Sequence, residues 1–176
     1  MEINKIEAGK NLPEEFNVII EIPSQEGRVK YEFDKKSRAI FVDRFSKTPM
    51  HYPCNYGFIP HTLSGDGDPC DVLVMTRYPL IIASVIQARP VGVLLMEDES
   101  GKDEKILAVP TSKMDPSFDN IRTMEDIDEL FKNQIVHFFE NYKDLDHGKW
   151  VKLQGWEDVD SAKKLIIEAS KRVKNS

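Results

Sequence analysis

The stretch Phe16-Asn17-Val18-Ile19-Ile20-Glu21-Ile22 alternates with a period of two residues. Four apolar residues fall on one side of an extended chain: Phe16, Val18, Ile20 and Ile22. Such alternation is typical of a β-strand that buries one face in a core. The stretch therefore predicts a strand that carries Glu21 on its other face.

Several segments downstream also have the pattern of strands. Residues 29–34 alternate in the same way, so Lys30 and Glu32 are expected to share one face of a second strand. A third predicted strand places three side chains on one face: Ile40, Val42 and Arg44. Short apolar runs, separated by turns rich in Gly, Pro and Asp, follow at 72–75, 91–96 and 106–109.

The C-terminal third changes to the spacing of helices. Thr123 and Asp126 form a capping-box signal before a first predicted helix. Its apolar face is Ile127, Leu130, Phe131, Ile135, Phe138, Phe139 and Tyr142. A second helix is predicted from about Ser161 to Val173, with one more strand at 150–156 between the two. Many short strands and two helices predict an α+β fold, a closed or nearly closed β-barrel with helices packed outside.

Length and composition predict one domain, residues 1–176, of an ordinary water-soluble protein, with 40% hydrophobic and 31% charged residues. The net charge of -6 argues against a protein that mainly binds nucleic acid or acidic membrane. We find no apolar leader and no run of membrane-spanning length, and we therefore expect a cytoplasmic protein. Cys54 and Cys70 are too few for a disulfide framework and are expected to be small buried residues rather than reactive ones.

The segment Ser64-Gly65-Asp66-Gly67-Asp68-Pro69-Cys70-Asp71-Val72 concentrates carboxylates just before an apolar run. Neighbouring carboxylates repel each other, so a cation is expected to neutralise them. Oxygen ligands without a histidine or thiolate pattern favour a hard cation such as Mg²⁺, Mn²⁺ or Ca²⁺. Pro69 excludes a helix interior and the glycines allow a sharp turn, so these side chains can converge.

Other polar residues have two interpretations when each is taken alone. Lys30, Glu32 and Glu21 could simply face water, and Asp103 with Lys105 could belong to a charged hairpin tip. The segment 51–61 is rich in Tyr, Pro and Gly, and suits either aromatic packing over a barrel mouth or phosphate-binding hydroxyls. Its two histidines lack a metal-ligand spacing and are expected at the surface or in a supporting role.

The segment Asp66-Gly67-Asp68-Pro69-Cys70-Asp71-Val72 resembles the D-[SGDN]-D-[PE]-x-D-x signature of the family I soluble inorganic pyrophosphatases. The resemblance covers nearly the whole chain and is closest to the short bacterial form. It extends over three flanking stretches: His51-Tyr52-Pro53-Cys54-Asn55-Tyr56-Gly57-Phe58-Ile59-Pro60, Arg89-Pro90-Val91-Gly92-Val93 and Lys149-Trp150-Val151-Lys152. It implies a five-stranded OB-like closed barrel with additional short strands and two C-terminal helices outside.

The resemblance also implies Mg²⁺-dependent hydrolysis of pyrophosphate to two phosphates, with several Mg²⁺ ions per site and Mn²⁺ or other divalent ions possible. Asp68 is implied as the general base that activates a water. The implied metal ligands are Asp66, Asp71, Asp103, Asp98, Glu21 and Glu32. The implied phosphate-binding residues are Lys30, Arg44, Tyr56, Lys105, Tyr142 and Lys143, with Tyr52 nearby. Cys70 replaces a more usual aliphatic residue, and its side chain is expected to point inward.

Short bacterial members of the family are usually homohexamers built from trimers, and the resemblance implies the same here. Two alternatives can be compared with this reading. An EF-hand calcium loop starting at Asp66 fails because its fifth, sixth and twelfth positions would be Cys70, Asp71 and Arg77. A barrel that binds oligonucleotides without catalysis should carry a basic groove, whereas the polar residues here are mainly acidic.

Overall fold

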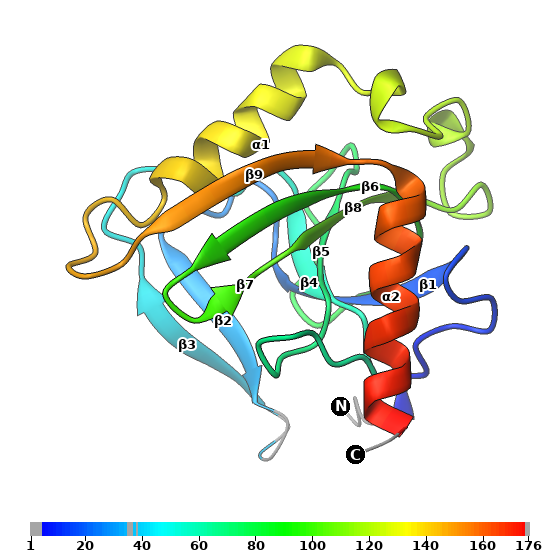
Figure 1. Ribbon diagram of the computed structural model, residues 1–176, viewed down its shortest axis with the longest axis horizontal. Coiled ribbons are helices and arrows are strands. Elements are labelled where there is room, and N and C mark those ends of the chain that lie inside the picture. The colour runs from blue at the N-terminus through cyan, green and yellow to red at the C-terminus, as the bar shows by residue number, and fades with distance from the viewer. Residues whose placement is uncertain (1–4, 35–36, 38, 175–176) are drawn as a thin grey trace.

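The computed structural model describes residues 5–34, 37 and 39–174 (Figure 1). The strands are β1 (Phe16–Ile22), β2 (Val29–Asp34), β3 (Ala39–Phe45), β4 (Asn55–Phe58), β5 (Asp71–Val74), β6 (Val85–Asp98), β7 (Gly101–Lys102), β8 (Lys105–Pro110) and β9 (Val151–Glu157). The helices are the short 3₁₀ helices Pro116–Phe118 and Met124–Asp126, then α1 (Glu129–Asn141) and α2 (Val159–Lys174).

Five strands close into a ring in the order β1-β4-β5-β8-β6, and the pairing of β6 with β1 completes it. Neighbours in the ring are antiparallel except β5 and β8, which run parallel. Ring closure removes the exposed strand edges that an open sheet would present. β7 and β9 extend the sheet by pairing with β6. The expected α+β fold, a closed barrel with helices outside, is confirmed.

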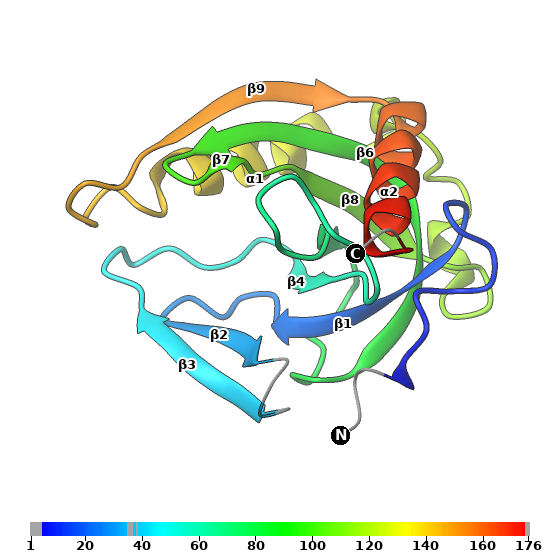
Figure 2. The same cartoon turned by 60° about the horizontal axis from the view of Figure 1, so that its bottom comes forward.

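The two helices cover different parts of the ring. Ala162, Ile166 and Ala169 of α2 are buried in one apolar cluster with residues of β1, β5, β6 and β8. Ile135 and Phe138 of α1 are buried in a second cluster, which includes side chains of β4 and β9. Burial of apolar surface against the sheet is the main source of stability for both helices. Figure 2 shows α2 at one end of β6 and α1 behind the sheet.

The start of α1 differs from the prediction. Asp128 is the N-cap of α1, where its carboxylate accepts a hydrogen bond of 3.2 Å from the Phe131 amide. The predicted capping box instead caps the preceding 3₁₀ helix, because Asp126 accepts from the backbone amide of Thr123 at 2.9 Å. The second helix and the strand at 150–156 are confirmed, with α2 two residues longer at its start.

β6 is longer than its predicted range of 91–96, because it runs unbroken for 14 residues. Pro90 lies inside it beside a shift of register between Pro90 and Gly92. A proline is tolerated at such an irregularity because no ladder hydrogen bond from its nitrogen is needed there. The long strand lets β6 pair with β1, β8, β7 and β9, so it connects the ring to the sheet extension.

A β-bulge interrupts β1 at Glu21. Ile20 pairs with Gly57 and Ile22 pairs with Tyr56, which leaves Glu21 as an extra residue between them. The bulge moves Ile22 into the core cluster of α1, whereas Phe16, Val18 and Ile20 pack in the cluster of α2. The prediction that Ile22 shares one continuous apolar face with the other three is therefore wrong.

A second bulge interrupts β3 at Asp43. Arg44 pairs with Lys30 and Val42 pairs with Tyr31, so Asp43 has no residue opposite it. Cross-strand partners share a face of the sheet, so Arg44 lies on the face of Lys30. The prediction that Arg44 shares a face with Ile40 and Val42 is therefore wrong, and the reason is the extra residue.

β2 and β3 form a separate two-stranded sheet beside the ring. Phe33 of β2 packs on Ile19 and Phe58 of the ring in a small apolar cluster. The Phe33 amide also donates a 2.8 Å hydrogen bond to the Glu21 carboxylate. Figures 1 and 2 place this hairpin on the side of the ring opposite α2. The hairpin thus lies against the ring, to which Phe33 connects it through apolar packing and through the hydrogen bond to Glu21.

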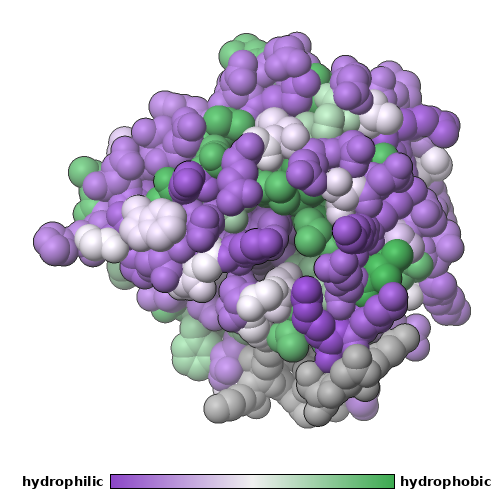
Figure 3. Space-filling model, in the orientation of Figure 1, coloured by the Kyte–Doolittle hydropathy of each residue, from purple (hydrophilic) through white to green (hydrophobic). Residues whose placement is uncertain are grey.

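Hydrophilic side chains cover most of the face seen in Figure 3, and apolar side chains form smaller patches between them. Neither helix in the described ranges combines the length and apolarity needed to cross a membrane.

Candidate active site

A polar cavity of about 360 Å³ opens between the hairpin, the 64–71 loop and the end of α1. The structure brings together every site residue predicted from the sequence. Those with acidic side chains are Glu21, Glu32, Asp66, Asp68, Asp71, Asp98 and Asp103. Those with basic or phenolic side chains are Lys30, Arg44, Lys105, Lys143, Tyr52, Tyr56 and Tyr142.

The acidic loop before β5 is a tight turn held by its own backbone. The Ser64 amide donates to the Asp68 carbonyl at 2.6 Å, and the Asp68 amide donates to the Asp66 carboxylate at 2.9 Å. Gly67 has a φ of +94°, which a residue with a side chain rarely adopts. Partial burial and the like charges of Asp68, Asp71 and other carboxylates raise the pKa of Asp66. The turn therefore presents carboxylates in excess of nearby positive charge.

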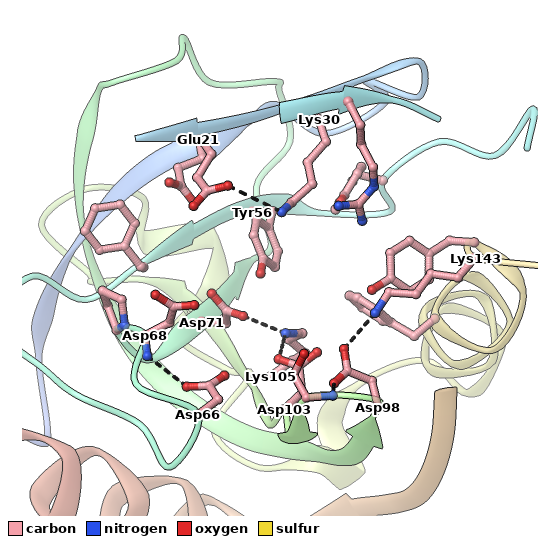
Figure 4. Close-up of a pocket in the computed structure, with 18 of the residues that line it drawn as sticks. Glu21, Lys30, Tyr56, Asp66, Asp68, Asp71, Asp98, Asp103, Lys105 and Lys143 are labelled. Atoms are coloured by element: carbon pink, nitrogen blue, oxygen red, sulfur yellow. Dashed lines mark hydrogen bonds and ion pairs between the residues drawn. The ribbon is translucent and has the colours of Figure 1, made fainter. Parts of the chain in front are cut away.

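Lys105 lies at the base of the cavity between two carboxylates (Figure 4). It pairs in register with Asp71 on the parallel strands β5 and β8, and its Nζ donates to Asp71 Oδ2 at 2.6 Å. It also donates to Asp103 Oδ1. Burial alone would lower the pKa of Lys105, but the charges of Asp71 and Asp103 raise it above its ordinary value. The buried ammonium thus stays charged and neutralises part of the acidic cluster.

A second buried ion pair closes the α1 side of the cavity. Lys143, just after α1, donates from Nζ to Asp98 Oδ2 at 2.7 Å, and both side chains are about nine-tenths buried. The amide of Ser100 also donates to the Asp98 carboxylate at 2.8 Å. Burial opposes ionisation of Asp98, but these hydrogen bonds hold its pKa below the usual range. Lys143 and Asp98 therefore form a buried ion pair at the surface of the cavity.

The hairpin contributes cations from above, as Figure 4 shows for Lys30. Lys30 Nζ lies 2.9 Å from Asp43 Oδ2 and 3.9 Å from Glu32 Oε2. Arg44 Nη1 lies 2.8 Å from the same oxygen of Asp43. Glu21 lies beneath the hairpin, where burial raises its pKa to about 8 despite the hydrogen bond from the β2 backbone. A cation close to Glu21 would favour its ionised form.

Three tyrosines line the wall between the hairpin and α1. Burial raises the pKa of Tyr52, Tyr56 and Tyr142 above the ordinary value, so their hydroxyls stay protonated at neutral pH. Phe138 of α1 stacks on Tyr142 with ring centroids 5.2 Å apart, and Tyr52 packs on Phe138 at 4.7 Å. The rings are therefore held rigidly, and each can present a hydroxyl donor.

The donor set suits a hard divalent cation, because it consists of carboxylate oxygens. The raised pKa values of Asp66 and Glu21 show that these carboxyls lack enough nearby positive charge to favour their ionised forms. As the side chains stand in the described residues, no three His, Cys, Asp or Glu groups form a ready metal cage. Lys105 explains part of this, because its ammonium bridges Asp71 and Asp103. The carboxylates that could hold a cation nevertheless line one cavity.

Some cavity residues were not predicted from the sequence. Glu99 and Lys149 line the same cavity and form an ion pair with each other. The sequence features that could have indicated them are the acidic run Glu97-Asp98-Glu99 and the flanking stretch that begins at Lys149. Asp43 contacts two cavity cations, and only the bulge in β3 identifies it.

The histidines and cysteines lie where the sequence predicts. His51 and His61 are exposed, and His51 Nδ1 lies 2.7 Å from the Gln25 carbonyl. Both cysteines are free and buried. Cys70 packs in the cluster of α2 and accepts a hydrogen bond from Ser64 at 3.4 Å. Surface histidines and an inward Cys70 are therefore confirmed.

Known proteins resemble the chain over nearly its full length. It matches the family described as "Inorganic pyrophosphatase" over residues 18–174. An inorganic pyrophosphatase of Rickettsia bellii (strain RML369-C) is 62% identical over 173 residues, covering 98% of each chain. That of Escherichia coli (strain K12) is 57% identical over 175 residues, covering 99% of each. The crystal structure of inorganic pyrophosphatase from Thermus thermophilus has a TM-score of 0.94 at 41% identity and covers 99% of both chains.

These matches confirm the resemblance found in the sequence and the expectation that the chain is an enzyme of that kind. The chain belongs to the inorganic pyrophosphatase family.

Proposed function

We propose that the chain hydrolyses inorganic pyrophosphate to two phosphates in a Mg²⁺-dependent reaction, with Asp68 as the general base. The observation that carries the proposal is one cavity in which carboxylates face cations and phenolic hydroxyls. Pyrophosphate is small and highly anionic, so its binding requires positive charge, and attack by water requires an acceptor for the proton. The lining supplies both kinds of group.

The cations and phenols would grip the substrate. Lys30 and Arg44 reach the cavity from the hairpin, and Lys143 reaches it from the end of α1. Arg44 can bind two phosphate oxygens with its planar guanidinium, whereas the lysines act as point charges. Tyr56 and Tyr142 would donate hydroxyl hydrogen bonds. Lys105 holds Asp71 and Asp103 and would also offer charge to a phosphate.

Asp68 would accept the proton of the attacking water. It lies at the exposed mouth of the cavity in the turn between Asp66 and Asp71. Its backbone is held by hydrogen bonds to Ser64 and Asp66, so the carboxylate approaches from a defined direction. A positioned general base contributes about 10² to 10⁴ in rate.

Asp66, Asp71 and Asp103 would hold the first metal ions, and Asp98, Glu21 and Glu32 would hold further ions that arrive with the substrate. When bound, Mg²⁺ lowers the pKa of a coordinated water and neutralises phosphate oxygens. Mn²⁺ or another divalent ion fits the same oxygen donors. The excess of acidic groups around the cavity supports loading of cations before the anionic substrate.

Phosphate release from pyrophosphate, measured with Mg²⁺ and with a chelator, tests the proposal. We expect two phosphates per pyrophosphate in Mg²⁺ and loss of activity in chelator that Mg²⁺ restores. Circular dichroism in both buffers shows whether the protein stays folded. A folded protein that releases no phosphate in Mg²⁺ or Mn²⁺ would rule the reaction out.

We also propose a homohexamer of two trimers and a cytoplasmic location. Large apolar side chains exposed on this chain support association: Phe45, Tyr78, Ile81 and Leu130. The two free thiols support a reducing compartment. Light scattering coupled to gel filtration should give six times the mass of one chain, and a monomeric mass would contradict the hexamer.

A further inference from the structure

Asp43 forms the closest contacts to two of the cations that face the cavity. Its Oδ2 accepts from Lys30 Nζ at 2.9 Å and from Arg44 Nη1 at 2.8 Å. Of the described side chains, those that line the cavity include Lys30 and Arg44 but not Asp43. Asp43 therefore contacts these two cations without itself lining the cavity.

The bulge in β3 makes this arrangement possible. In a regular strand Asp43 and Arg44 would point to opposite faces. Because Asp43 is the extra residue, Arg44 is placed opposite Lys30, and one carboxylate oxygen reaches both cations. Bulges beside active sites commonly redirect a side chain in this way. The irregularity thus has a specific local result, a shared acceptor behind a pair of cations.

We propose that Asp43 is a positioning residue that holds Lys30 and Arg44 in the orientation that binds substrate phosphate, an inference that rests on the proposed pyrophosphatase function. Lysine has three donors and arginine five, so one bond from each to Asp43 leaves others for phosphate oxygens. Both side chains have many rotamers, and fixing them in advance lowers the entropy cost of binding.

The charge of Asp43 is stable over the pH range of an assay. Partial burial would raise the pKa of the Asp43 carboxyl, but the hydrogen bond from Lys30 and the charges of Lys30 and Arg44 hold it below its usual value. The carboxylate is therefore ionised at neutral pH and binds both cations through charge-assisted hydrogen bonds.

Removing this carboxylate has two effects that change KM in opposite directions. Loss of a negative charge near an anion site should by itself tighten substrate binding and lower KM. Loss of positioning should raise KM, because Lys30 and Arg44 must then be ordered by the substrate. We therefore expect KM to rise, with kcat little changed, since Asp43 does not line the cavity.

The experiment compares Asp43→Ala, Asp43→Asn and Glu14→Gln with the wild type. Glu14→Gln removes the same charge from the surface pair of Glu14 with Lys163, which lies outside the cavity. We expect Asp43→Ala to raise KM for pyrophosphate about tenfold with kcat within about twofold. Asp43→Asn keeps an acceptor oxygen and should raise KM less, and Glu14→Gln should leave it unchanged. A KM for Asp43→Ala equal to or below that of the wild type overturns the proposal.

Binding of inorganic phosphate, measured by calorimetry in Mg²⁺, separates this proposal from the proposed function. If the wild type hydrolyses no pyrophosphate, the function fails, but weaker phosphate binding by Asp43→Ala still supports positioning. Thermal unfolding shows whether each variant is folded. If the alanine variant is not, the KM and phosphate affinity of Asp43→Asn decide, and values equal to those of the wild type overturn the proposal.

Discussion

Lys105 and Asp71 are direct partners on the parallel strands β5 and β8, and Lys105 Nζ lies 2.6 Å from Asp71 Oδ2. The same ammonium bonds to Asp103, so a single buried cation neutralises two carboxylates that are proposed to hold metal. Sheet register, rather than closeness in sequence, creates this cluster. It follows that the stability of the site depends on the charge of Lys105.

Replacing Lys105 by methionine should destabilise the metal-free protein by about 3 to 5 kcal/mol, because two partly buried carboxylates lose their counter-charge. Mg²⁺ should restore part of the loss by neutralising the same groups. Urea unfolding in chelator and in Mg²⁺, followed by tryptophan fluorescence, measures both effects. Lys163→Met, which breaks a surface pair with Glu14, is the control and should cost less than about 1 kcal/mol. Equal losses in the two variants would contradict this account.

The two lysines that follow α1 should differ in their contribution to stability. Lys143 and Asp98 are both about nine-tenths buried, whereas the Lys149 side chain is 48% exposed beside Glu99. We expect Lys143→Met to cost about 2 to 4 kcal/mol, since it leaves a buried carboxylate without its counter-charge, and Lys149→Met to cost clearly less. The free energy of unfolding from urea titration checks the order. A larger loss of unfolding free energy in Lys149→Met than in Lys143→Met would contradict this prediction.

The cysteines should be unreactive in the folded protein. Burial raises the pKa of the Cys54 and Cys70 thiols, which keeps them protonated and shielded from reagents. We expect almost no reaction with a thiol reagent under native conditions. After denaturation we expect two thiols to react per chain. Fast reaction of either thiol in the native protein would contradict this prediction.

Asp71→Asn should weaken Mg²⁺ binding itself. Asp71 lies at the start of β5 and directs its carboxylate toward Lys105 and the cavity, whereas Asp68 lies in the exposed turn. Loss of a group that only orients a metal ligand typically lowers metal affinity about 10- to 100-fold, so loss of a charged oxygen ligand itself should lower the affinity for Mg²⁺ by about tenfold or more. Calorimetric titration of the wild type, Asp71→Asn and Asp68→Asn gives the comparison. Equal affinities in both variants would contradict separate roles.

Much of the fold and the site could be predicted from the sequence. Period-two stretches predict β1, β2 and β3, short apolar runs predict β5, β8 and the middle of β6, and helical spacing predicts α1 and α2. The ring strand β4 was not predicted, because its residues lie in a stretch rich in Tyr, Pro and Gly. Every predicted site residue lines one cavity, because the acidic turn, the hairpin and the end of α1 each carry distinct polar residues. Tight turns and amphipathic patterns depend on local residue types, which a single sequence displays.

The two bulges could not be predicted in the same way. A period of two assumes regular pairing, and one extra residue at Glu21 or Asp43 reverses the faces that follow. Arg44 was therefore assigned to the wrong face, and Asp43 was overlooked. The ion pair of Lys105 with Asp71 also depends on the parallel register of β5 and β8, which joins residues 34 positions apart. Such features depend on partner strands that the local sequence does not reveal.

The rate of phosphate release by Asp68→Asn at saturating Mg²⁺ tests the central claim most directly. An amide cannot accept the proton of the attacking water, but it preserves the size of the side chain and leaves the metal carboxylates in place. We predict that kcat falls at least about 100-fold below the wild type, while Mg²⁺ affinity and KM stay close to it. A kcat within about threefold of the wild type would contradict the role of Asp68 as the base.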